Sequence, residues 1–304
     1  FVQAESEVAA SNMLFGAAAA GVRTFTTSSS PGISLMAESI SYIAGALLPV
    51  VYVNIVRGGP GLGGILPAQS DYFQACKGGG HGDYHLLVLG PSTVQEAVDH
   101  VILAFELADK YNNPVMVLGD GMIGQMMEPV SFPDQVPSPP PPKPWATTGM
   151  KGRPQYLVRS LYLNPVELEE NNLIMRAKYD AMERDEVRHE SYFADEEMDV
   201  MVSAYGTMAR IAKTAIDNLR EEGHKIGLLR PISLYPFPKQ AMRDASQRAK
   251  KIMVIELSTG QMVDDVNLAL EGKMKSDLYF RVGGNVPSAV EILDEVSRLY
   301  GEVK

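Results

Sequence analysis

The sequence has a single cysteine, Cys76, no excess of positive charge and no long apolar run. One cysteine excludes an internal disulfide, and no charged and apolar leader marks secretion, so we expect a cytoplasmic protein. The formal net charge of -10 and the pI near 5.1 argue against a nucleic-acid partner, because such proteins usually present a basic face. The apolar runs stop well short of a membrane span, which argues against a membrane partner.

The length of 304 residues exceeds one typical domain and favours two compact units. In the first part of the chain, alternating apolar and turn-forming segments predict a doubly wound α/β domain with a mainly parallel sheet. The segment LLPVVYVNIV is almost entirely apolar, as expected for a strand covered on both faces. Helices are expected at 8–21, 33–45 and 93–111, strands at 23–27, 47–56, 86–89 and 115–118, and a turn at 28–32.

The proline-rich segment PDQVPSPPPPKPW cannot form a helix or an interior strand, because proline lacks the backbone donor and restricts the residue before it. The charged segment 165–190 has helical periodicity, and a solvated face explains it better than a binding role. A second, doubly wound α/β unit follows, with Gly223 ending its first helix. We therefore divide the chain into a first domain at 1–132, a linker and charged helix at 133–197, and a second domain at 198–304. In the second domain we expect strands at 200–204, 225–229 and 251–256, helices at 208–222 and 239–248, and a rigid connector at 234–238.

Glu7 stands at the start of a helix built almost entirely from small residues, in the stretch AESEVAASNMLFGAAAAG. An acid in the first turn is favoured by the helix dipole, and Ser6 is a candidate cap, so Glu7 taken alone is a helix-terminus residue. The following strand runs into Ser30, Pro31 and Gly32. Glutamate, small-residue helix, strand and Ser-Pro-Gly form a composite pattern that is more specific than an isolated glycine motif.

This composite resembles the pyrimidine-binding domain of thiamine diphosphate enzymes. Nearly the whole chain resembles the alpha subunit of the 2-oxoacid:ferredoxin oxidoreductases, most of all the 2-ketoisovalerate (branched-chain) type, and its second domain resembles the transketolase C-terminal domain. The resemblance implies that Glu7 hydrogen-bonds the aminopyrimidine ring of thiamine and that Ser30, Pro31 and Gly32 belong to the cofactor site. A carboxylate held against the ring nitrogen favours the imino form, which removes the C2 proton, so Glu7 is an expected catalytic residue.

Arg57 ends the apolar strand and enters the loop RGGPGLGG. An arginine here can be a surface ion-pair residue, but a guanidinium also grips a carboxylate through two hydrogen bonds. The resemblance implies that Arg57 contacts the 2-oxoacid. The loop reads Gly-Pro-Gly-Leu-Gly where the 2-oxoglutarate type usually reads Gly-Pro-Ser-Thr-Gly, which favours an apolar substrate tail, met by apolar residues between Gly61 and Leu66. The expected substrate loop is Gly58, Gly59, Pro60, Gly61 and Leu62.

Further along, LPAQSDYFQACKGGGHGDYH resembles the Gln-x-Asp and Gly-x-His-Gly patterns of the family. Gln69, Asp71 and His81 are therefore candidates for shaping the site or a subunit contact. For His81 a structural role competes with catalysis, because thiamine chemistry can draw its base from the ring of the cofactor. Lys77 can lower the thiol pKa of Cys76, but a lone cysteine next to a core is more often inert.

The sequence Gly119-Asp120-Gly121 follows a strand, as the magnesium and diphosphate motif of thiamine enzymes does, but the asparagine expected about 25 to 30 residues later is absent. We interpret it as a turn and expect no metal site in this chain. Clustered cysteines for iron-sulfur ligation are absent as well. Mg2+ and the iron-sulfur clusters are therefore expected on partner subunits. The turn in YGTMARIA, 205–212, can receive an anion at a helix start, but a scaffold role is the better interpretation.

The resemblance implies an alpha subunit of a hetero-oligomer that oxidatively decarboxylates a branched-chain 2-oxoacid to acyl-CoA. Its expected cofactor is thiamine diphosphate, shared with a beta-type subunit, and coenzyme A is the co-substrate. An iron-sulfur subunit and ferredoxin are the other expected partners. Alternatives are 2-oxoglutarate, pyruvate or an aryl pyruvate as substrate, or a non-catalytic assembly subunit. In the family a further module with a Tyr-Pro-x-Thr-Pro motif precedes the glutamate, so we expect the first domain to lack its N-terminal part and its sheet to have an exposed edge.

Overall fold

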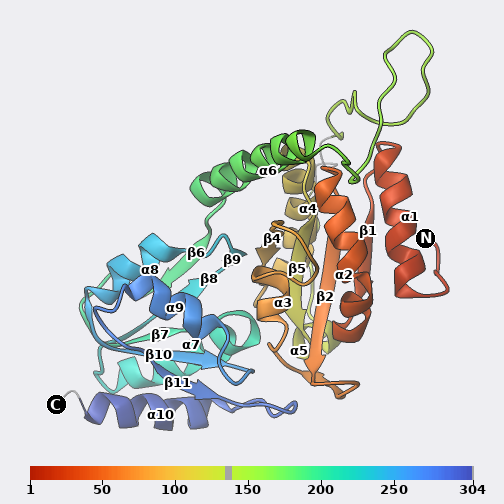
Figure 1. Ribbon diagram of the computed structural model, residues 1–304. Helices are drawn as coiled ribbons and strands as arrows, with labels where there is room; N and C mark the ends of the chain where they lie inside the picture. The colour runs from red at the N-terminus through yellow and green to blue at the C-terminus, as the bar shows by residue number, and fades with distance from the viewer. Residues whose placement is uncertain (134–138, 303–304) are drawn as a thin grey trace.

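The computed structural model describes residues 1–133 and 139–302, which form two α/β domains joined by the long helix α6 (Pro165–Asp185) (Figure 1). Part of the expected proline-rich linker, 134–138, lies outside the described residues. The predicted class, with two mainly parallel sheets, is confirmed. None of the helices in the described ranges combines the length and apolar character needed to cross a membrane.

The first sheet has the strand order β1-β2-β5-β4-β9, and β3 pairs with β2 outside this path. Its strands are β1 (Phe25–Ser28), β2 (Val51–Gly58), β3 (Gly64–Pro67), β4 (Leu87–Leu89), β5 (Val115–Asp120) and β9 (Ser233–Tyr235). The helices of this domain are α1 (Glu7–Ala19), α2 (Ser30–Gly45), α3 (Tyr72–Cys76), α4 (Val94–Tyr111) and α5 (Gly121–Gln125). The strand β1 lies at one edge, where exposed and half-buried residues alternate.

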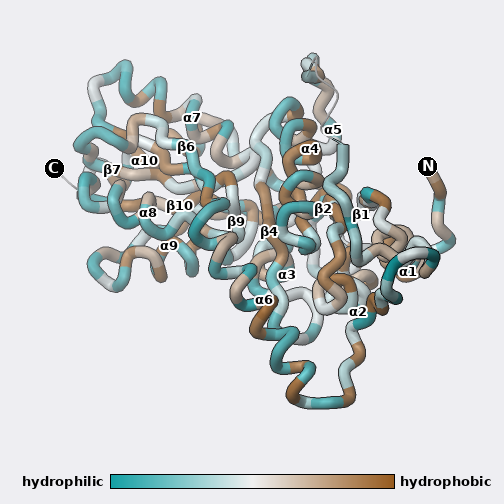
Figure 2. The backbone as a smooth tube through the Cα atoms, turned by 90° about the horizontal axis from the view of Figure 1, so that it is seen from above, coloured by the Kyte–Doolittle hydropathy of each residue, from teal (hydrophilic) through white to brown (hydrophobic). Residues whose placement is uncertain are grey.

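The centre of the first sheet is formed by β2 and β5, paired in parallel from Val51 opposite Val115 to Val56 opposite Asp120. Every residue of β5 is buried, because helices cover both faces of the sheet. Figure 2 shows brown, apolar stretches through the middle of this domain, along β4 and α4. The carboxyl ends of β1, β2 and β5 therefore meet at one edge, where ligands bind in open α/β sheets.

The second sheet has the order β11-β10-β7-β8-β6, in which β6 alone pairs antiparallel among the described strands. Its strands are β6 (His189–Tyr192), β7 (Met198–Ser203), β8 (Ile226–Pro231), β10 (Ala249–Glu256) and β11 (Asp277–Phe280). Its helices are α7 (Gly206–Glu221), α8 (Lys239–Ser246), α9 (Met262–Leu270) and α10 (Ala289–Gly301). Gly223 adopts φ +89 just after α7, the left-handed conformation that glycine allows at a helix end.

Two local predictions differ from the structure. Ser30, Pro31 and Gly32 were expected in a turn, but they form the first turn of α2, because proline suits the first helical position and needs no donor there. The expected connector at 234–238 contributes part of β9, which pairs antiparallel with β4 of the first sheet. A strand from the second part of the chain, β9, therefore forms the edge of the first sheet beside β4.

The helix α6 confirms the predicted charged helix and its partly docked character. Its buried residues recur every three to four positions, so one stripe contacts the body while charged residues face outward. Asn171 anchors this stripe by donating from Nδ2 to the carbonyl of Gly45 at the end of α2. The first half of α6 is thus attached to the first domain.

Candidate active site

Glu7 is the first residue of α1 and packs directly on the first turn of α2. A Cβ atom added to Gly32 would overlap Ser28 Oγ and would lie 2.8 Å from Glu7 Cγ and 3.1 Å from Glu7 Oε1. Only glycine therefore allows the helix to approach the glutamate this closely. Ser6 caps α1 by accepting from the backbone of Ala9 at 3.2 Å, so the cap does not occupy the Glu7 carboxylate.

The Glu7 side chain is half-buried and lines a cavity of about 470 Å³ next to β1. Among the described residues, no hydrogen bond or ion pair engages its carboxylate. A half-buried carboxylate without a partner is able to accept a hydrogen bond from a ligand. The helix-terminus interpretation and the ligand interpretation are therefore compatible, since the first turn of α1 stabilises the negative charge.

Arg57 lies on the other side of the same turn of α2. Its backbone N–H donates to Ser30 Oγ at 3.1 Å, and Ser30 and Pro31 line a second cavity of about 660 Å³ together with Arg57. No carboxylate in the described part of the chain pairs with its guanidinium, and its Nε is buried without a partner. The alternative of a surface ion-pair residue is therefore not what the structure shows. A buried donor without a partner is suited to an incoming carboxylate.

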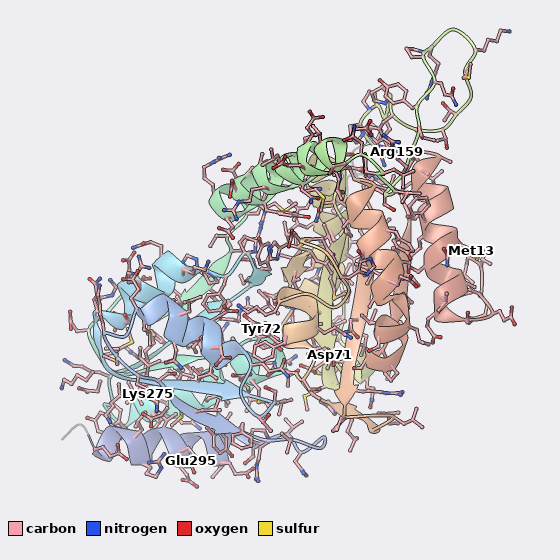
Figure 3. All side chains as sticks on the ribbon, in the orientation of Figure 1. Met13, Asp71, Tyr72, Arg159, Lys275 and Glu295 are labelled. Atoms are coloured by element: carbon pink, nitrogen blue, oxygen red, sulfur yellow. The ribbon has the colours of Figure 1, made fainter. Side chains whose placement is uncertain are left out.

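The larger cavity lies between the two domains. Figure 3 labels Asp71 and Tyr72 at the start of α3, which sits at this junction. The first domain contributes the loop Gly58, Gly59, Pro60 and Gly61, and the second domain contributes 257–259, Gln261, Val282 and Gly283. Leu62, which the sequence placed in the substrate loop, does not line the cavity and is 82% exposed.

Asp71 is held at the wall of this cavity by the central strand. Asn54 of β2 is fully buried and donates from Nδ2 to Asp71 Oδ2 at 2.9 Å. Because Asn54 stands opposite Ser28 in the parallel pairing of β1 and β2, the same register also places Ser28 beside Glu7. Two paired residues at the carboxyl ends of β1 and β2, Ser28 and Asn54, thus lie next to the acids of the two cavities, Glu7 and Asp71.

Gln69 is buried and spans the two domains. Its backbone N–H donates to the Leu257 carbonyl at 2.9 Å, its Oε1 accepts from Leu257 N at 2.9 Å, and its Nε2 donates to the Tyr205 carbonyl at 2.9 Å. Both the oxygen and the nitrogen of its side-chain amide are therefore engaged within the chain. Gln69 shapes the cavity by holding the second domain, and its amide is not free for a ligand.

His81 lies away from both cavities. It is exposed, its ring meets the ring of Tyr42 edge-on at 6.1 Å, and its carbonyl accepts from Ser41 Oγ at 2.6 Å. Neither cavity that holds Glu7 or Arg57 includes it. Within this chain His81 is placed as a surface residue beside α2.

Asp120, in the sequence that resembles a magnesium motif, ends β5 and caps α5. Its Oδ1 accepts from Met122 N at 2.9 Å and from Thr207 Oγ1 at 2.8 Å, and its Oδ2 accepts from Thr207 N at 3.2 Å. The start of α7 is thus already capped by a carboxylate of the first domain, which supports the scaffold interpretation of that turn. Burial raises the pKa of Asp120. Within residues 1–133 and 139–302, no group of side chains is arranged to hold a metal ion.

The thiol of Cys76 is buried, and burial raises its pKa well above the ordinary value. Lys77 pairs with Asp265 of the second domain, which also accepts from Tyr72 Oη at 2.6 Å. Cys76 therefore has the setting of an inert thiol, as the sequence suggested.

Sequence reasoning missed the cavity residues of the second domain, among them Leu257, Gln261 and Val282. The one local signal was the segment Leu-Ser-Thr-Gly-Gln directly after the apolar strand KIMVIE, since the carboxyl end of a parallel strand is where ligands gather. The sequence pattern does not predict that this segment faces the loop after β2 in the first domain.

Comparison with known proteins defines the class. Residues 1–201 match the family model described as pyruvate flavodoxin/ferredoxin oxidoreductase, thiamine diphosphate-binding, and residues 198–292 match pyruvate:ferredoxin oxidoreductase core domain II. The chain belongs to this family of 2-oxoacid oxidoreductases, and the resemblance inferred from the sequence is confirmed.

Among individual relatives, the chain is 47% identical to ketoisovalerate oxidoreductase subunit VorB of Methanothermobacter marburgensis and 48% identical to that of Methanothermobacter thermautotrophicus. Each alignment covers 99% of this chain and 85% of the relative. It is 34% identical to the 2-oxoglutarate synthase subunit KorA of Methanothermobacter thermautotrophicus, across 98% of this chain and 86% of the relative.

Solved structures share the fold. The 2-oxoglutarate:ferredoxin oxidoreductase from Magnetococcus marinus, with 2-oxoglutarate, coenzyme A and succinyl-CoA bound, has a TM-score of 0.84 and 25% identity. The match covers 98% of this chain and 57% of that one, so this chain spans a little over half of its length. A split-gene transketolase, as an inactive beta4 tetramer, matches with a TM-score of 0.62 and 14% identity, over 100% of this chain and 84% of that one, which shows similarity of fold alone.

Proposed function

We propose that this chain is the alpha-type subunit of a ferredoxin-dependent oxidoreductase that decarboxylates 2-oxoisovalerate oxidatively to acyl-CoA. Identities of 47–48% to ketoisovalerate oxidoreductase subunits, against 30–35% to 2-oxoglutarate synthase subunits and 27–28% to pyruvate synthase subunits, support a branched-chain substrate. The observation that carries the proposal is the first turn of α2, which contacts Glu7 through Gly32 and the backbone of Arg57 through Ser30.

The residues present fit half of a thiamine diphosphate site. When bound, this cofactor supplies the carbanion-stabilising chemistry that decarboxylation of a 2-oxoacid requires. The Glu7 carboxylate has no competing partner among the described residues, so it is free to hold a proton shared with the pyrimidine nitrogen. Gly32 stands beside it and leaves room for the glutamate, while Ser30 and Pro31, from the same helical turn, line the Arg57 cavity.

Arg57 binds the substrate carboxylate in this proposal. Its buried Nε without a partner and its place at the end of β2 favour a bidentate contact, which fixes the orientation of the acid. The loop from Gly58 to Gly61 brings backbone close to the ligand. Asp71 stands on the opposite side of the loop, tied to Asn54, and keeps the cavity polar at that end.

The rest of the chemistry belongs to partner subunits. We propose a beta-type subunit that holds the diphosphate and Mg2+, an iron-sulfur subunit, and ferredoxin as electron acceptor, in a cytoplasmic hetero-oligomer with coenzyme A as co-substrate. The names of the relatives as subunits, and the coenzyme A bound to the Magnetococcus enzyme, support this arrangement.

Two alternatives remain part of the test. Turnover of 2-oxoglutarate, pyruvate or an aryl pyruvate in preference to 2-oxoisovalerate would change the substrate but keep the enzyme. A non-catalytic assembly role would leave Glu7 without effect on turnover. Measuring turnover of the four acids with one purified complex separates the substrates, and a Glu7 variant of the same complex tests the assembly role.

The first prediction concerns Glu7. In the complex reconstituted with partner subunits, Glu7→Gln keeps the size of the side chain but removes its negative charge and proton affinity. We expect 2-oxoacid turnover to fall about a hundredfold or more and thiamine diphosphate to bind more weakly. Glu170→Gln is the control, since Glu170 is an exposed glutamate on α6. Wild-type turnover and cofactor affinity in Glu7→Gln would contradict the catalytic role.

A further inference from the structure

The far wall of the Arg57 cavity belongs to the second domain. Leu257 and Ser258 follow β10 directly, and Val282 and Gly283 follow β11. These strands are parallel neighbours, so the segments after them leave the second sheet at the same edge. The carboxyl ends of both sheets thus face one cavity, one from each domain.

Close backbone contacts hold this wall in place. Gly284 lies so near Leu66 of β3 that a Cβ atom on the glycine would overlap the leucine side chain. A Cβ atom on Gly58 would lie 3.7 Å from Gly283 C, so the segment after β11 rests on the residue that follows Arg57. This segment is therefore packed against the substrate loop itself.

A second set of hydrogen bonds ties the segment after β10 to α3. Gln261 donates from Nε2 to the Ser70 carbonyl at 2.8 Å and accepts at Oε1 from Phe73 N at 2.8 Å. Gln69 adds its hydrogen bonds to Leu257. The wall and the side of the cavity that carries Asp71 are therefore one connected unit.

The charges of the cavity set the direction in which an acid would lie. Arg57 is the cation among the described lining residues. The start of α9, on the opposite wall, is already capped by the buried Glu256, which accepts from Met262 N at 3.0 Å and Val263 N at 2.8 Å. A second anion would be repelled there, which favours Arg57 as the place of the substrate carboxylate and leaves the wall of the second domain for the tail.

The apolar surface that such a tail would meet comes from the second domain. Leu62, the leucine of the substrate loop, points outward with 82% of its surface exposed. Leu257 and Val282 line the cavity instead, with 1% and 45% exposed. The exposed fraction of Val282 is apolar area that a branched alkyl group can cover.

We propose that the second domain determines the specificity for the substrate tail, and that Val282, supported by Leu257, contacts the branched alkyl group of the 2-oxoacid. This inference rests on the proposed function. It assigns to the second domain a direct role in substrate selection, beyond its scaffold role.

The test uses the complete complex and compares kcat/KM for 2-oxoisovalerate with kcat/KM for pyruvate, whose tail is a single methyl group without the branch. Val282→Ala removes two methyl groups, and the loss of even one methylene-sized contact in an apolar pocket costs about tenfold in kcat/KM. We expect the ratio to fall about tenfold or more, with kcat/KM for pyruvate within about twofold of wild type. Val282→Phe should lower the ratio as well, by filling the space of the branched group.

Two further variants keep the result specific. Val290→Ala makes the same change at an exposed valine of α10, so it should not alter the ratio, and Leu62→Ala tests the loop leucine as the competing specificity residue. An unchanged ratio in Val282→Ala, or a shift in Leu62→Ala instead, would overturn the inference while leaving the proposed function intact. A wild-type complex that turns over none of these acids would overturn the proposed function itself.

Discussion

At the scale of single residues, Gly32 decides whether Glu7 can reach its position. Its φ is not in the left-handed region, so the requirement for glycine comes from space alone. The hypothetical Cβ atom meets the side chains of Glu7 and Ser28 together, so a larger residue here must displace them. A glycine that sequence analysis placed in a turn is therefore a packing residue of the site.

Gly32→Ala should displace the Glu7 side chain and lower thiamine-dependent turnover of the complex by about tenfold or more, because small misplacements of a catalytic group are costly. Gly16→Ala is the matched control, since nothing lies within 4 Å of a Cβ atom at Gly16 and alanine favours the helix by about 0.5–1 kcal/mol. Turnover and thermal unfolding of both variants check this. Equal activity of Gly32→Ala and wild type would contradict the requirement for glycine at this position.

At the scale of elements, Asp120 caps two helices at once, and these helices belong to different domains: α5 to the first and α7 to the second. Its carboxylate accepts hydrogen bonds from Met122 and Ile123 of α5 and from Thr207 of α7. Hydrogen bonds to a charged group contribute about 1.5–3 kcal/mol, and a buried acceptor that loses its partners costs about as much again. This single side chain thus couples the end of β5 to the docking of the second domain.

Asp120→Asn places an amide N–H2 near the Thr207 backbone N–H, so one hydrogen bond is replaced by two facing donors. We expect the free energy of unfolding of the full chain to fall by about 2–3 kcal/mol. In a double-mutant cycle with Thr207→Val, the two changes should show a coupling of about 1 kcal/mol. Urea unfolding measures both, with Asp99→Asn on the exposed face of α4 as control. Strictly additive effects would mean that the two side chains act independently.

At the scale of the whole molecule, Arg230 joins three parts of the chain. It is 2% exposed and binds Glu96 of α4 through Nη2–Oε1 at 2.6 Å and Glu190 of β6 through Nε–Oε2 at 2.7 Å. Burial raises the pKa of Glu96, but hydrogen bonds from Arg230 and Ser92 outweigh this and lower it to about 2. The depressed pKa makes the domain interface sensitive to acid.

Because the folded-state pKa lies below the ordinary 4.5, Glu96 stabilises the fold fully above about pH 4.5 and loses this contribution as the pH falls toward 2. We expect Glu96→Gln to be less stable than wild type by up to about 3 kcal/mol at neutral pH. The difference should shrink as the pH falls toward 2. Urea midpoints between pH 2 and 7 measure this, with the exposed Glu106→Gln as control. A difference that does not change with pH would contradict the assignment.

The alternation of strands and helices followed from local sequence, and the structure shifts most ends by a few residues only. The pattern around Glu7 and the arginine at the end of β2 were also visible, because each depends on neighbours within one strand-to-helix unit. The place of Leu62 in the substrate loop stays a prediction. Its apolar character suggested a pocket, but the loop turns the side chain to the surface.

The sequence by itself determined the fold class, since hydrophobic periodicity and turn chemistry depend on near neighbours. The resemblance of its motifs to a known family indicated the family and the two charged residues proposed to act. Only the tertiary structure decided that residues of the second domain line the Arg57 cavity and that β9 pairs with the first sheet. Contacts such as that of Gln69 with Leu257 join residues 188 positions apart. Such pairs are selected by the packing of whole domains, so no local pattern in the chain can specify them.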